Sequence, residues 1–379
     1  MTEKLMRLTK LCLCFLLIVL FGSGCNPSHQ QENDEELLSM REQETPVKGS
    51  ENQLQGKQLT LPLEAEEAQF HSVADWKDDK TIFYILNDSD GSKVYTYNIY
   101  SGDSILFFTS EAPIVQLEAN EDNSLLLIHT SPSSYEAELI IVDSEAKVQY
   151  QTTIESYELQ YTWNQQSQHQ LFVSSFNEDW TYNTYIIDTK EQTLVENPVD
   201  IPFIQWINDH EVSYLKWDQE APALTAPLYI YNLDSKEETS VSDGVVANTN
   251  YTNIMSTIEI VDEDGTATVR FYDSTSQQQL SEMPTRLVAL YSDWSIPYHD
   301  MDNNNHFYML EVNKEKTGFS LISFSLDSGE KQTVIEKMEN LPIKLSPNGD
   351  YALYGARYEH LINLESQKML ELISLKQEG

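Results

Sequence analysis

A short tag recurs along this chain, and its spacing constrains the possible folds more than any other feature. Each copy is a short apolar run followed by an acidic residue and then Ser or Thr. The copies end at Tyr100-Ser101 (a degenerate copy), Asp143-Ser144, Asp188-Thr189, Asp234-Ser235, Asp273-Ser274, Asp327-Ser328 and Glu365-Ser366. They lie 43, 45, 46, 39, 54 and 38 residues apart. A period of about 40–45 residues is typical of β-propeller blades.

Strand composition supports this interpretation. From about residue 57 onward, Tyr, Thr, Val, Ile and Phe are dense, and they stand in short runs separated by polar turns. No long apolar stripe with a 3.6-residue period follows the N-terminal region, so we expect almost no helix. Each repeat reads as four strands, and the pairs Asp90-Gly91 and Asp264-Gly265 predict hairpins between second and third strands. The tag then falls at the turn into the fourth strand, where Asp and Ser side chains accept backbone N–H bonds.

Tryptophans give a second periodic signal. Trp76, Trp163, Trp206 and Trp294 lie 87, 43 and 88 residues apart, close to two, one and two repeats. The skipped positions fall near Ala119 and Asn250. We predict that these indoles end the first strand of their repeats and pack between adjacent sheets; stacking on a ligand is the alternative.

The predicted fold is an all-β propeller of four-stranded blades. A lone four-stranded sheet exposes two apolar faces and two edges, and stacking the sheets in a closed ring covers the faces. The tag counts seven blades. Six remain possible, because Gln58–Leu63 could pair with the last repeat, and the 54-residue gap before Asp327 could contain an irregular blade. A pair of β-sandwiches or an open solenoid is the alternative, although a sandwich would not keep one tag at a constant period.

The N-terminus carries the pattern of an export signal. Lys4, Arg7 and Lys10 precede the apolar run Leu11–Phe21, which is too short to cross a bilayer as a helix and fits a secretory signal peptide. Small residues then lead to Cys25, a stretch that resembles a bacterial lipobox. That resemblance implies a diacylglycerol on Cys25, and hence a membrane anchor. The alternatives are an unlipidated secreted protein and an uncleaved anchor.

These signals divide the chain into three parts. Residues 1–24 form the predicted lipoprotein signal peptide. Residues 25–56 contain the lipidated Cys and an acidic linker that is too poor in apolar residues to fold. Residues 57–379 form the propeller domain.

The charge of the chain excludes one class of partner. The sequence has 23 Lys and Arg against 61 Asp and Glu, a formal net charge of −38. Binding to duplex nucleic acid depends on cationic side chains that neutralise phosphates, so we expect no nucleic acid partner. Strong self-repulsion favours a soluble monomer held away from the membrane surface.

Motifs for catalysis or for a metal are missing from the sequence. No two histidines stand at a metal-ligand spacing, and the nearest polar cluster, between His299 and His306, reads as a long loop. The stretches that start at Asp88 and Asp262 lack a Glu at the twelfth position of a calcium loop. No G-x-S-x-G or phosphate-binding loop follows the signal. We therefore predict no catalytic residue, no metal and no cofactor.

One group of loops is a candidate binding site. The loops between second and third strands of the second, third and fourth repeats carry Tyr135, Trp180 and Trp217, flanked by Asp179 and Asp218. In a propeller these loops share a face, and exposed aromatic side chains anchor interfaces. We predict a binding patch for an envelope protein, a peptide or a glycan; ordinary loop packing is the alternative.

Four features in combination resemble one known family. They are the Cys-anchored acidic chain, ADW before TIFYIL, the recurring acidic-Ser/Thr tags and the late LSPNGDYALYG unit. This combination resembles the YqgU-like lipoproteins of Bacillus-type Gram-positive bacteria. The resemblance implies a six-bladed β-propeller lipoprotein without an assigned activity, and it adds no catalytic residues.

The expected function is a non-enzymatic binding or scaffold module, lipid-anchored on the extracellular face of the cell membrane. One alternative is an envelope hydrolase or lyase that uses acidic residues in the central channel. A cation-dependent sensor is another. An enzyme should show carboxylates with raised pKa values converging on the axis, whereas a scaffold should show its polar features spread over loops.

Overall fold

The computed structural model describes residues 58–218, 223–290, 293–313 and 317–377. All of them belong to one compact unit, Leu54–Gly379. Within these ranges the chain forms 31 strands and no helix, so the described part has no helix that could span a bilayer. The predicted signal peptide, Cys25 and the acidic linker lie outside the described residues.

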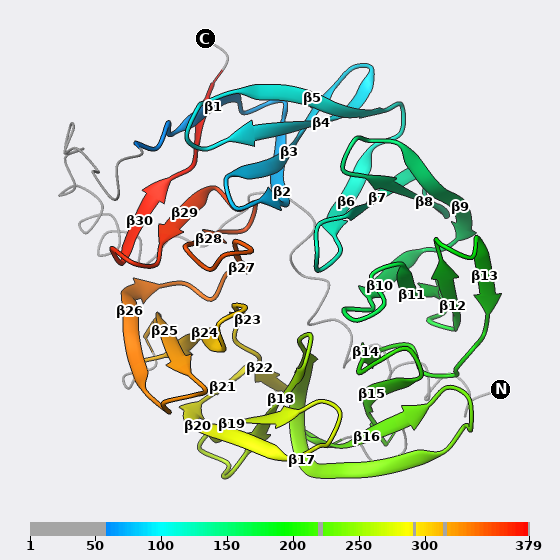
Figure 1. The fold of residues 1–379 in the computed structure, drawn as a ribbon, viewed down its shortest axis with the longest axis vertical. Coiled ribbons are helices and arrows are strands. Elements are labelled where there is room, and N and C mark those ends of the chain that lie inside the picture. The colour runs from blue at the N-terminus through cyan, green and yellow to red at the C-terminus, as the bar shows by residue number, and fades with distance from the viewer. Residues whose placement is uncertain (1–57, 219–222, 291–292, 314–316, 378–379) are drawn as a thin grey trace, which may run out of the picture. The chain divides into compact units, whose positions relative to one another are not determined.

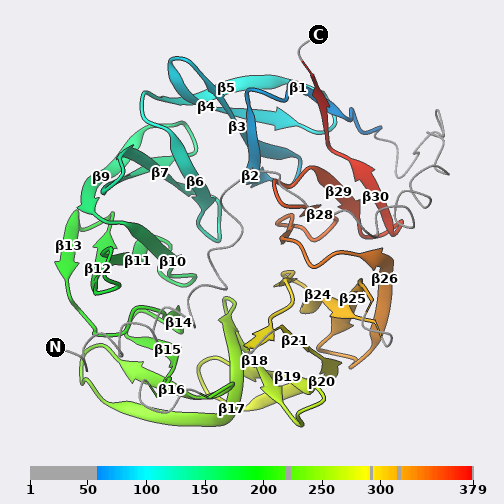
Figure 2. The same cartoon turned by 180° about the vertical axis from the view of Figure 1, so that it is seen from behind.

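Seven four-stranded antiparallel units follow one another around a ring (Figures 1 and 2). The first unit consists of β2 (Phe70–Asp78), β3 (Thr81–Asp88), β4 (Gly91–Asn98) and β5 (Ser104–Ser110), and the second of β6 (Ile114–Ala119), β7 (Leu125–Ser133), β8 (Glu136–Asp143) and β9 (Val148–Glu155). The third consists of β10 (Glu158–Trp163), β11 (Gln170–Phe176), β12 (Tyr182–Asp188) and β13 (Thr193–Glu196). The fourth consists of β14 (Gln205–Trp206), β15 (Glu211–Leu215), β16 (Ala226–Asn232) and β17 (Glu238–Asn250). The fifth unit consists of the second half of β17 with β18 (Ile254–Ile260), β19 (Thr266–Asp273) and β20 (Gln279–Arg286). The sixth consists of β23 (His299–Met301), β24 (His306–Val312), β25 (Phe319–Ser325) and β26 (Lys331–Met338). The seventh consists of β27 (Ile343–Leu345), β28 (Tyr351–Tyr354), β29 (His360–Asn363) and β30 (Lys368–Glu371).

Two short pairs of strands stand outside these units. A hairpin of β21 (Val288–Leu290) and β22 (Asp293–Ser295) lies between the fifth and sixth units and explains the 54-residue spacing of the tag. Near the chain ends, β1 (Leu63–Glu66) pairs in parallel with β31 (Ile373–Lys376). The segment that precedes the first unit therefore does pair near the C-terminus. It adds no strand to the seventh unit, so the unit boundaries do not shift.

A hydrophobic cluster fills each of the seven interfaces between neighbouring units. The strand β3 shows why its sequence is apolar throughout. Ile82 and Tyr84 pack toward the seventh unit, and the alternate residues Phe83 and Ile85 pack toward the second. Successive side chains of a strand point to opposite faces, and here both faces are buried. The all-β propeller predicted from the sequence is confirmed.

The ring closes where the first unit meets the seventh. Trp76 is 1% exposed and shares a core cluster with Leu353 and Leu361 of the seventh unit. Its indole N–H donates to the backbone oxygen of Lys344 at 3.2 Å, and the N–H of Val73 donates to the oxygen of Arg357 at 3.0 Å. These contacts join positions more than 260 residues apart.

The predicted role of the tryptophans is confirmed for three of the four. Near its end, the innermost strand of each unit has one residue that pairs with a buried apolar residue of the second strand. We call these seven the equivalent residues; they are Trp76, Ala119, Trp163, Trp206, Asn250, Met301 and Leu345. The placement of Trp294 in this series is wrong, because it lies in β22. Trp294 still packs between the fifth and sixth units, so an inserted hairpin reproduced the spacing by coincidence.

The tag is turn chemistry, as predicted, but its copies occupy two registers. In three units the acidic residue of the tag ends the third strand and accepts backbone N–H bonds; these residues are Asp143, Asp188 and Asp273. In the other four the accepting side chain lies two residues earlier; these residues are Asn98, Asn232, Ser325 and Asn363. Both registers put a short acceptor side chain at the last residue of the third strand.

Candidate functional site

Seven polar residues line the inner edge of the ring at one level. Each stands one position before the equivalent residue defined above, on the innermost strand of its unit. They are Asp75, Glu118, Thr162, Gln205, Thr249, Asp300 and Lys344. We call this set the axial ring. Its members come from all seven units, so the fold itself brings them together.

Two aspartates of the axial ring lock neighbouring units to each other. Asp75 accepts the N–H of Trp76 at 2.7 Å and that of Ala119 in the second unit at 2.9 Å, and Lys344 of the seventh unit binds it at 3.1 Å. Asp300 repeats the pattern, with bonds of 2.8 Å from the N–H of Met301 and from that of Leu345. The same acceptor geometry therefore occurs at two unit interfaces.

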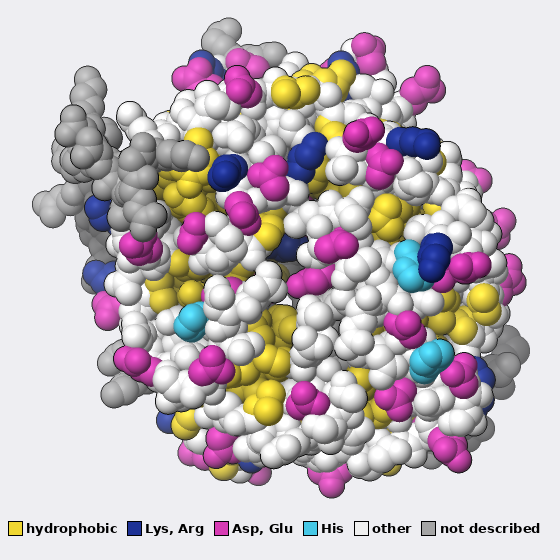
Figure 3. Space-filling model, viewed as in Figure 1, with side chains coloured by type: hydrophobic (Ala, Val, Ile, Leu, Met, Phe, Trp, Pro, Cys, Tyr) yellow, Lys and Arg dark blue, Asp and Glu magenta, His cyan; other side chains and the backbone are white. Residues whose placement is uncertain are grey.

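Water reaches the axial ring although it lies at the inner edge of every unit. The side chain of Lys344 is 38% exposed, while its partner Asp75 is only 2% exposed. Glu118 and Asp300 are also partly exposed. Figure 3 shows a hollow at the centre of one face, with a cationic side chain at its wall and acidic side chains beside it.

The charges of the axial ring perturb one another. Burial raises the pKa of the Glu118 carboxyl to about 7, although the charge of Lys344 opposes the rise. Burial likewise raises the pKa of Asp300 to about 6. Burial alone would lower the pKa of Lys344, but the nearby carboxylates outweigh it and raise that pKa. Between about pH 4.5 and 7 the carboxyl of Glu118 is protonated in the folded chain but ionised in the unfolded chain. The free energy of unfolding therefore falls at this group as the pH rises through that window.

A neutral histidine stands beside the axial ring. His299 Nδ1 lies 2.8 Å from the carbonyl oxygen of Pro297, so this nitrogen carries the proton and donates it. The other ring nitrogen then accepts the hydroxyl of Thr249 at 3.0 Å. Burial lowers the pKa of His299, in agreement with a neutral ring. Placing His299 in a long loop is wrong: it begins β23, and only the short turn before His306 is irregular.

The predicted aromatic residues lie in the loops expected for them. Tyr135 is 60% exposed in the β7–β8 hairpin and Trp217 is 45% exposed after β15. Trp180 lies in the β11–β12 turn with a left-handed backbone, φ 64°, which is costly for a residue with a bulky side chain. Asp179 accepts the N–H of Thr181 at 3.1 Å and shapes this turn, and Asp218 is the last described residue before the gap.

Connections between units extend this surface. Tyr157, 55% exposed between β9 and β10, lies with its ring 6.4 Å from that of Tyr135. Its N–H donates to the oxygen of Phe176, whose ring lies 6.2 Å from Trp180 and 5.5 Å from Phe203. We define the aromatic band as Tyr135, Tyr157, Trp180, Phe203 and Trp217. Sequence reasoning missed Tyr157 and Phe203, which lie on the connections between units.

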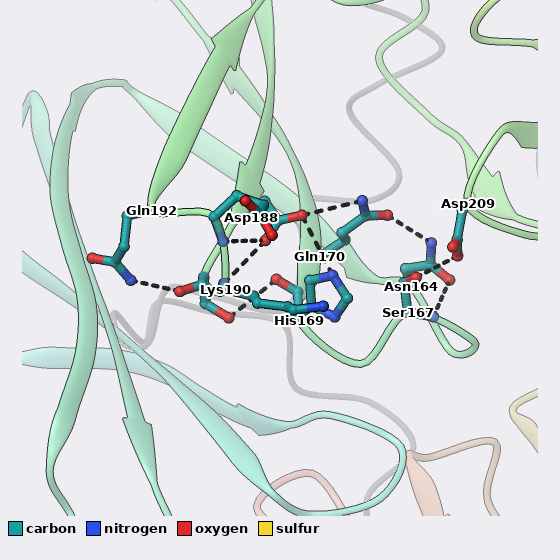
Figure 4. Close-up of polar contacts among 10 residues, drawn as sticks. Asn164, Ser167, His169, Gln170, Asp188, Lys190, Gln192 and Asp209 are labelled. Carbon is teal, nitrogen blue, oxygen red and sulfur yellow. Dashed lines mark hydrogen bonds and ion pairs between the residues drawn. The ribbon is translucent and has the colours of Figure 1, made fainter.

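A polar network in the third unit combines Ser, His and Asp without forming a catalytic triad (Figure 4). His169 lies 3.4 Å from Asp188, but the hydroxyl of Ser167 donates to Asp209 of the next unit instead. In a triad the serine bonds the histidine that takes its proton. Asp188 also accepts the backbone N–H of Lys190 at 3.0 Å, so this network stabilises turns.

The acidic turns and the axial ring differ in what they can hold. Asp88 and Asp262 accept the backbone N–H groups of Asp90 and Asp264, at 2.8 and 3.0 Å. Within the described ranges, no three His, Cys, Asp or Glu side chains are arranged to hold a metal ion. The axial ring instead offers separated carboxylates, a lysine and hydroxyls.

Comparison with known proteins identifies a family and a full-length relative. Residues 98–355 match the family described as the YqgU-like 6-bladed beta propeller domain. That span contains five complete units of this structure and parts of two, whereas the description counts six blades. The uncharacterized lipoprotein YqgU of Bacillus subtilis (strain 168) is 28% identical over 371 residues, which are 97% of this chain and 98% of that protein.

Solved structures share the fold. An uncharacterized protein of Listeria monocytogenes EGD-e superimposes with a TM-score of 0.78 at 19% identity, over 84% of this chain and 99% of that one. The β-propeller domain of the Trilobed protease of Pyrococcus furiosus, described as having an open velcro topology, gives 0.54 at 11% identity, over 82% and 100%. At these identities the likeness extends to the fold alone.

Proposed function

This chain belongs to the YqgU-like six-bladed β-propeller family, and on that basis we propose that it is a lipid-anchored protein that acts as a non-enzymatic binding module on the extracellular face of the cell membrane. The relative from Bacillus subtilis is named a lipoprotein and matches nearly the whole chain. The small residues before Cys25 supply the lipidation pattern. In this proposal residues 1–24 are removed, Cys25 carries the lipid, and residues 25–56 tether the propeller in a Gram-positive envelope.

Lipidation has a direct test. Cells of a Gram-positive host that express the chain are grown with labelled palmitate, and label is expected on the exported wild-type chain but not on Cys25→Ser, because serine has no thiol to accept diacylglycerol. The variant should appear in the medium or as an unprocessed precursor. Equal label on both chains would refute the assignment of Cys25.

The aromatic band carries the binding part of the proposal. Tyr135, Tyr157, Phe203 and Trp217 each expose 45% or more of their surface, and they follow one another over three neighbouring units. Acidic residues border the band, among them Glu136, Glu158 and Asp218. Exposed aromatic rings beside carboxylates suit a basic polypeptide segment, which can combine ion pairing with cation–π contacts. We therefore propose a basic segment of an envelope protein as the partner.

A charge-neutral substitution tests the band. The double variant Trp180→Ala, Trp217→Ala keeps the net charge but removes two rings, each worth about 0.5–1 kcal/mol to a bound cation. We expect its affinity for a fluorescent Lys-Gly repeat peptide, measured by anisotropy, to fall by about 5- to 30-fold. The matched control is Trp294→Phe, a change outside the band. Equal affinity of the double variant and the wild type, with folding intact by circular dichroism, would contradict the proposal.

An envelope hydrolase or lyase is the second candidate, and one observation favours it. Glu118 has a pKa of about 7 at the axis, which suits general acid–base catalysis near neutral pH. Against it, the carboxylates of Asp75 and Asp300 are already committed to backbone N–H groups. Turnover of an envelope polymer that is lost in Glu118→Gln would support this second function over the first.

A further inference from the structure

The segment that leads into the first unit lies along the boundary between the first and seventh units, which we call the closing seam. From residue 58 to residue 66 the side chains alternate strictly between exposed and part-buried. The part-buried side chains of Leu59, Leu61, Leu63 and Ala65 all pack against the hydrophobic cluster of the closing seam. An extended chain turns alternate residues to one side, so one side of this segment covers the cluster and the other faces water. We call residues 58–66 the strap.

The first half of the strap is bonded to the first unit. Thr60 donates its backbone N–H to the oxygen of Ile99 at 2.8 Å and its hydroxyl to the oxygen of Tyr100 at 2.7 Å. In return, the hydroxyl of Tyr97 donates to the backbone oxygen of Thr60 at 2.5 Å. These bonds fix the strap to the turn between β4 and β5.

The second half of the strap holds the C-terminal strand. Leu63 donates its N–H to the oxygen of Leu372 at 2.8 Å, and the strands β1 and β31 then run in parallel, with an ion pair of 2.5 Å between Glu64 and Lys376. Among the described strands, β31 pairs with β1 and with no other. The strap is therefore the strand partner on which the order of β31 depends.

The strand β31 in turn belongs to the closing seam. Its first residue, Ile373, and the preceding Leu372 are buried in the same cluster as Trp76, and their N–H groups both donate to the oxygen of Glu359, at 3.1 and 2.9 Å. Glu359 directly precedes β29 of the seventh unit. A chain of contacts thus runs from the first unit through the strap and β31 to the seventh unit.

The closing seam differs from the other boundaries between units in one respect. Every other pair of neighbouring units is joined by the chain itself, whereas the first and seventh units are held together by non-covalent contacts. Local opening favours the places where segments near the chain ends can separate. We infer that the strap is a releasable closure of the propeller: while it is bound the closing seam is shut, and its detachment frees β31 and opens the ring there first.

This inference adds a mechanical role to the tether of the proposed function, and that role rests on the proposed lipid anchor. The strap begins where the predicted linker ends, so tension between the membrane and the ring acts on the strap before it reaches any unit. The bonds of Thr60 are the first that it meets. The ring would then respond to a pull on its anchor by loosening at the closing seam.

Two pairs of variants of the full chain in detergent test the closure by hydrogen exchange, read by mass spectrometry. The double variant Leu61→Ser, Leu63→Ser removes the apolar side of the strap. Its matched control is Glu64→Ser, Glu66→Ser, which changes the exposed side of the same segment. The ion pair that this control removes is exposed and contributes little.

The second pair displaces the strap without changing it. A methyl group on Gly102 would lie 2.8 Å from Cγ2 of Thr60, and Thr60 can turn away only by giving up its hydroxyl bond. Gly329→Ala is the matched control, because Gly329 has a similar φ, 70° against 76°, and a methyl group there meets nothing within 4 Å. The two replacements therefore carry a similar backbone cost, and only Gly102→Ala pushes on the strap.

In the double leucine variant we expect peptides that cover β31, and those that contain Val73, to exchange at least about 10-fold faster than in the wild type. Val73 reports on the closing seam because its N–H donates across it to Arg357. Gly102→Ala should accelerate the same peptides, and neither control should. Peptides of the third and fourth units should be unchanged in all four variants.

Three results would overturn the inference: unchanged exchange of β31 in the double leucine variant, equal acceleration in all seven units, or equal effects of the two glycine replacements on β31. The measurement involves no lipid and no peptide ligand. Its outcome is therefore independent of the tests of Cys25 and of the aromatic band.

Discussion

Trp76→Ala is expected to lower the free energy of unfolding by about 3–5 kcal/mol, the cost of truncating a fully buried aromatic side chain. Trp76 is 1% exposed and fills the cluster between the first and seventh units. Its loss also removes the indole N–H bond to Lys344. Stabilities of small domains lie near 5–15 kcal/mol, so this one change should remove a large part of the total.

The measurement is unfolding in guanidinium chloride, followed by far-ultraviolet circular dichroism because each substitution removes a fluorophore. Trp217→Ala is the matched control: the same replacement at a residue that is 45% exposed should cost less than about 1 kcal/mol. Similar losses of unfolding free energy in the two variants would mean that Trp76 is not buried between two units.

Asp75→Ala is the second change with a large expected effect, also about 3–5 kcal/mol. The substitution leaves the N–H groups of Trp76 and Ala119 without their acceptor and removes the carboxylate that Lys344 contacts. Buried donors without partners are costly. The carboxylate of Asp75 is thus expected to contribute to the stability of the closed ring.

Asp293→Ala is a close control for Asp75→Ala. Asp293 also precedes a tryptophan and accepts its N–H, at 2.8 Å, but it is exposed on the β21–β22 hairpin. Its replacement should cost no more than about 1 kcal/mol. Unfolding curves at pH 7 compare the two variants, and equal losses would show that the inter-unit bond of Asp75 adds nothing.

The sequence predicted the architecture well because the repeat and the turn chemistry are local. The last residue of a third strand needs a short acceptor side chain, and this need recurs in every unit, at Asp143 as at Asn363. The pattern did not distinguish the two registers, because Asp-Ser and Asn-x-Asp-Ser turns look alike without strand ends. The placement of Trp294 at the end of an innermost strand was wrong for a related reason: the Asp-Trp pair of an inserted hairpin resembles Asp75-Trp76.

The axial ring was missed for a different reason. Its members are of five residue types, and each resembles an ordinary surface residue within its own strand. Only alignment of the units by strand register places Glu118 at the level of Asp300 and Lys344. Their convergence depends on closure of the ring, which is a long-range property. The aromatic loops were easier to find, because second-to-third hairpins can be identified from local turn signals.

The coupling between positions 75 and 344 tests the closed ring most directly, since 269 residues separate them in the sequence. Unfolding free energies are measured for Asp75→Ala, Lys344→Met and the double variant. The account predicts that the double variant loses about 1–3 kcal/mol less than the sum of the two single losses, as expected for residues in direct contact. Losses that add to within about 0.5 kcal/mol would mean that the first and last units do not meet, and would contradict the account.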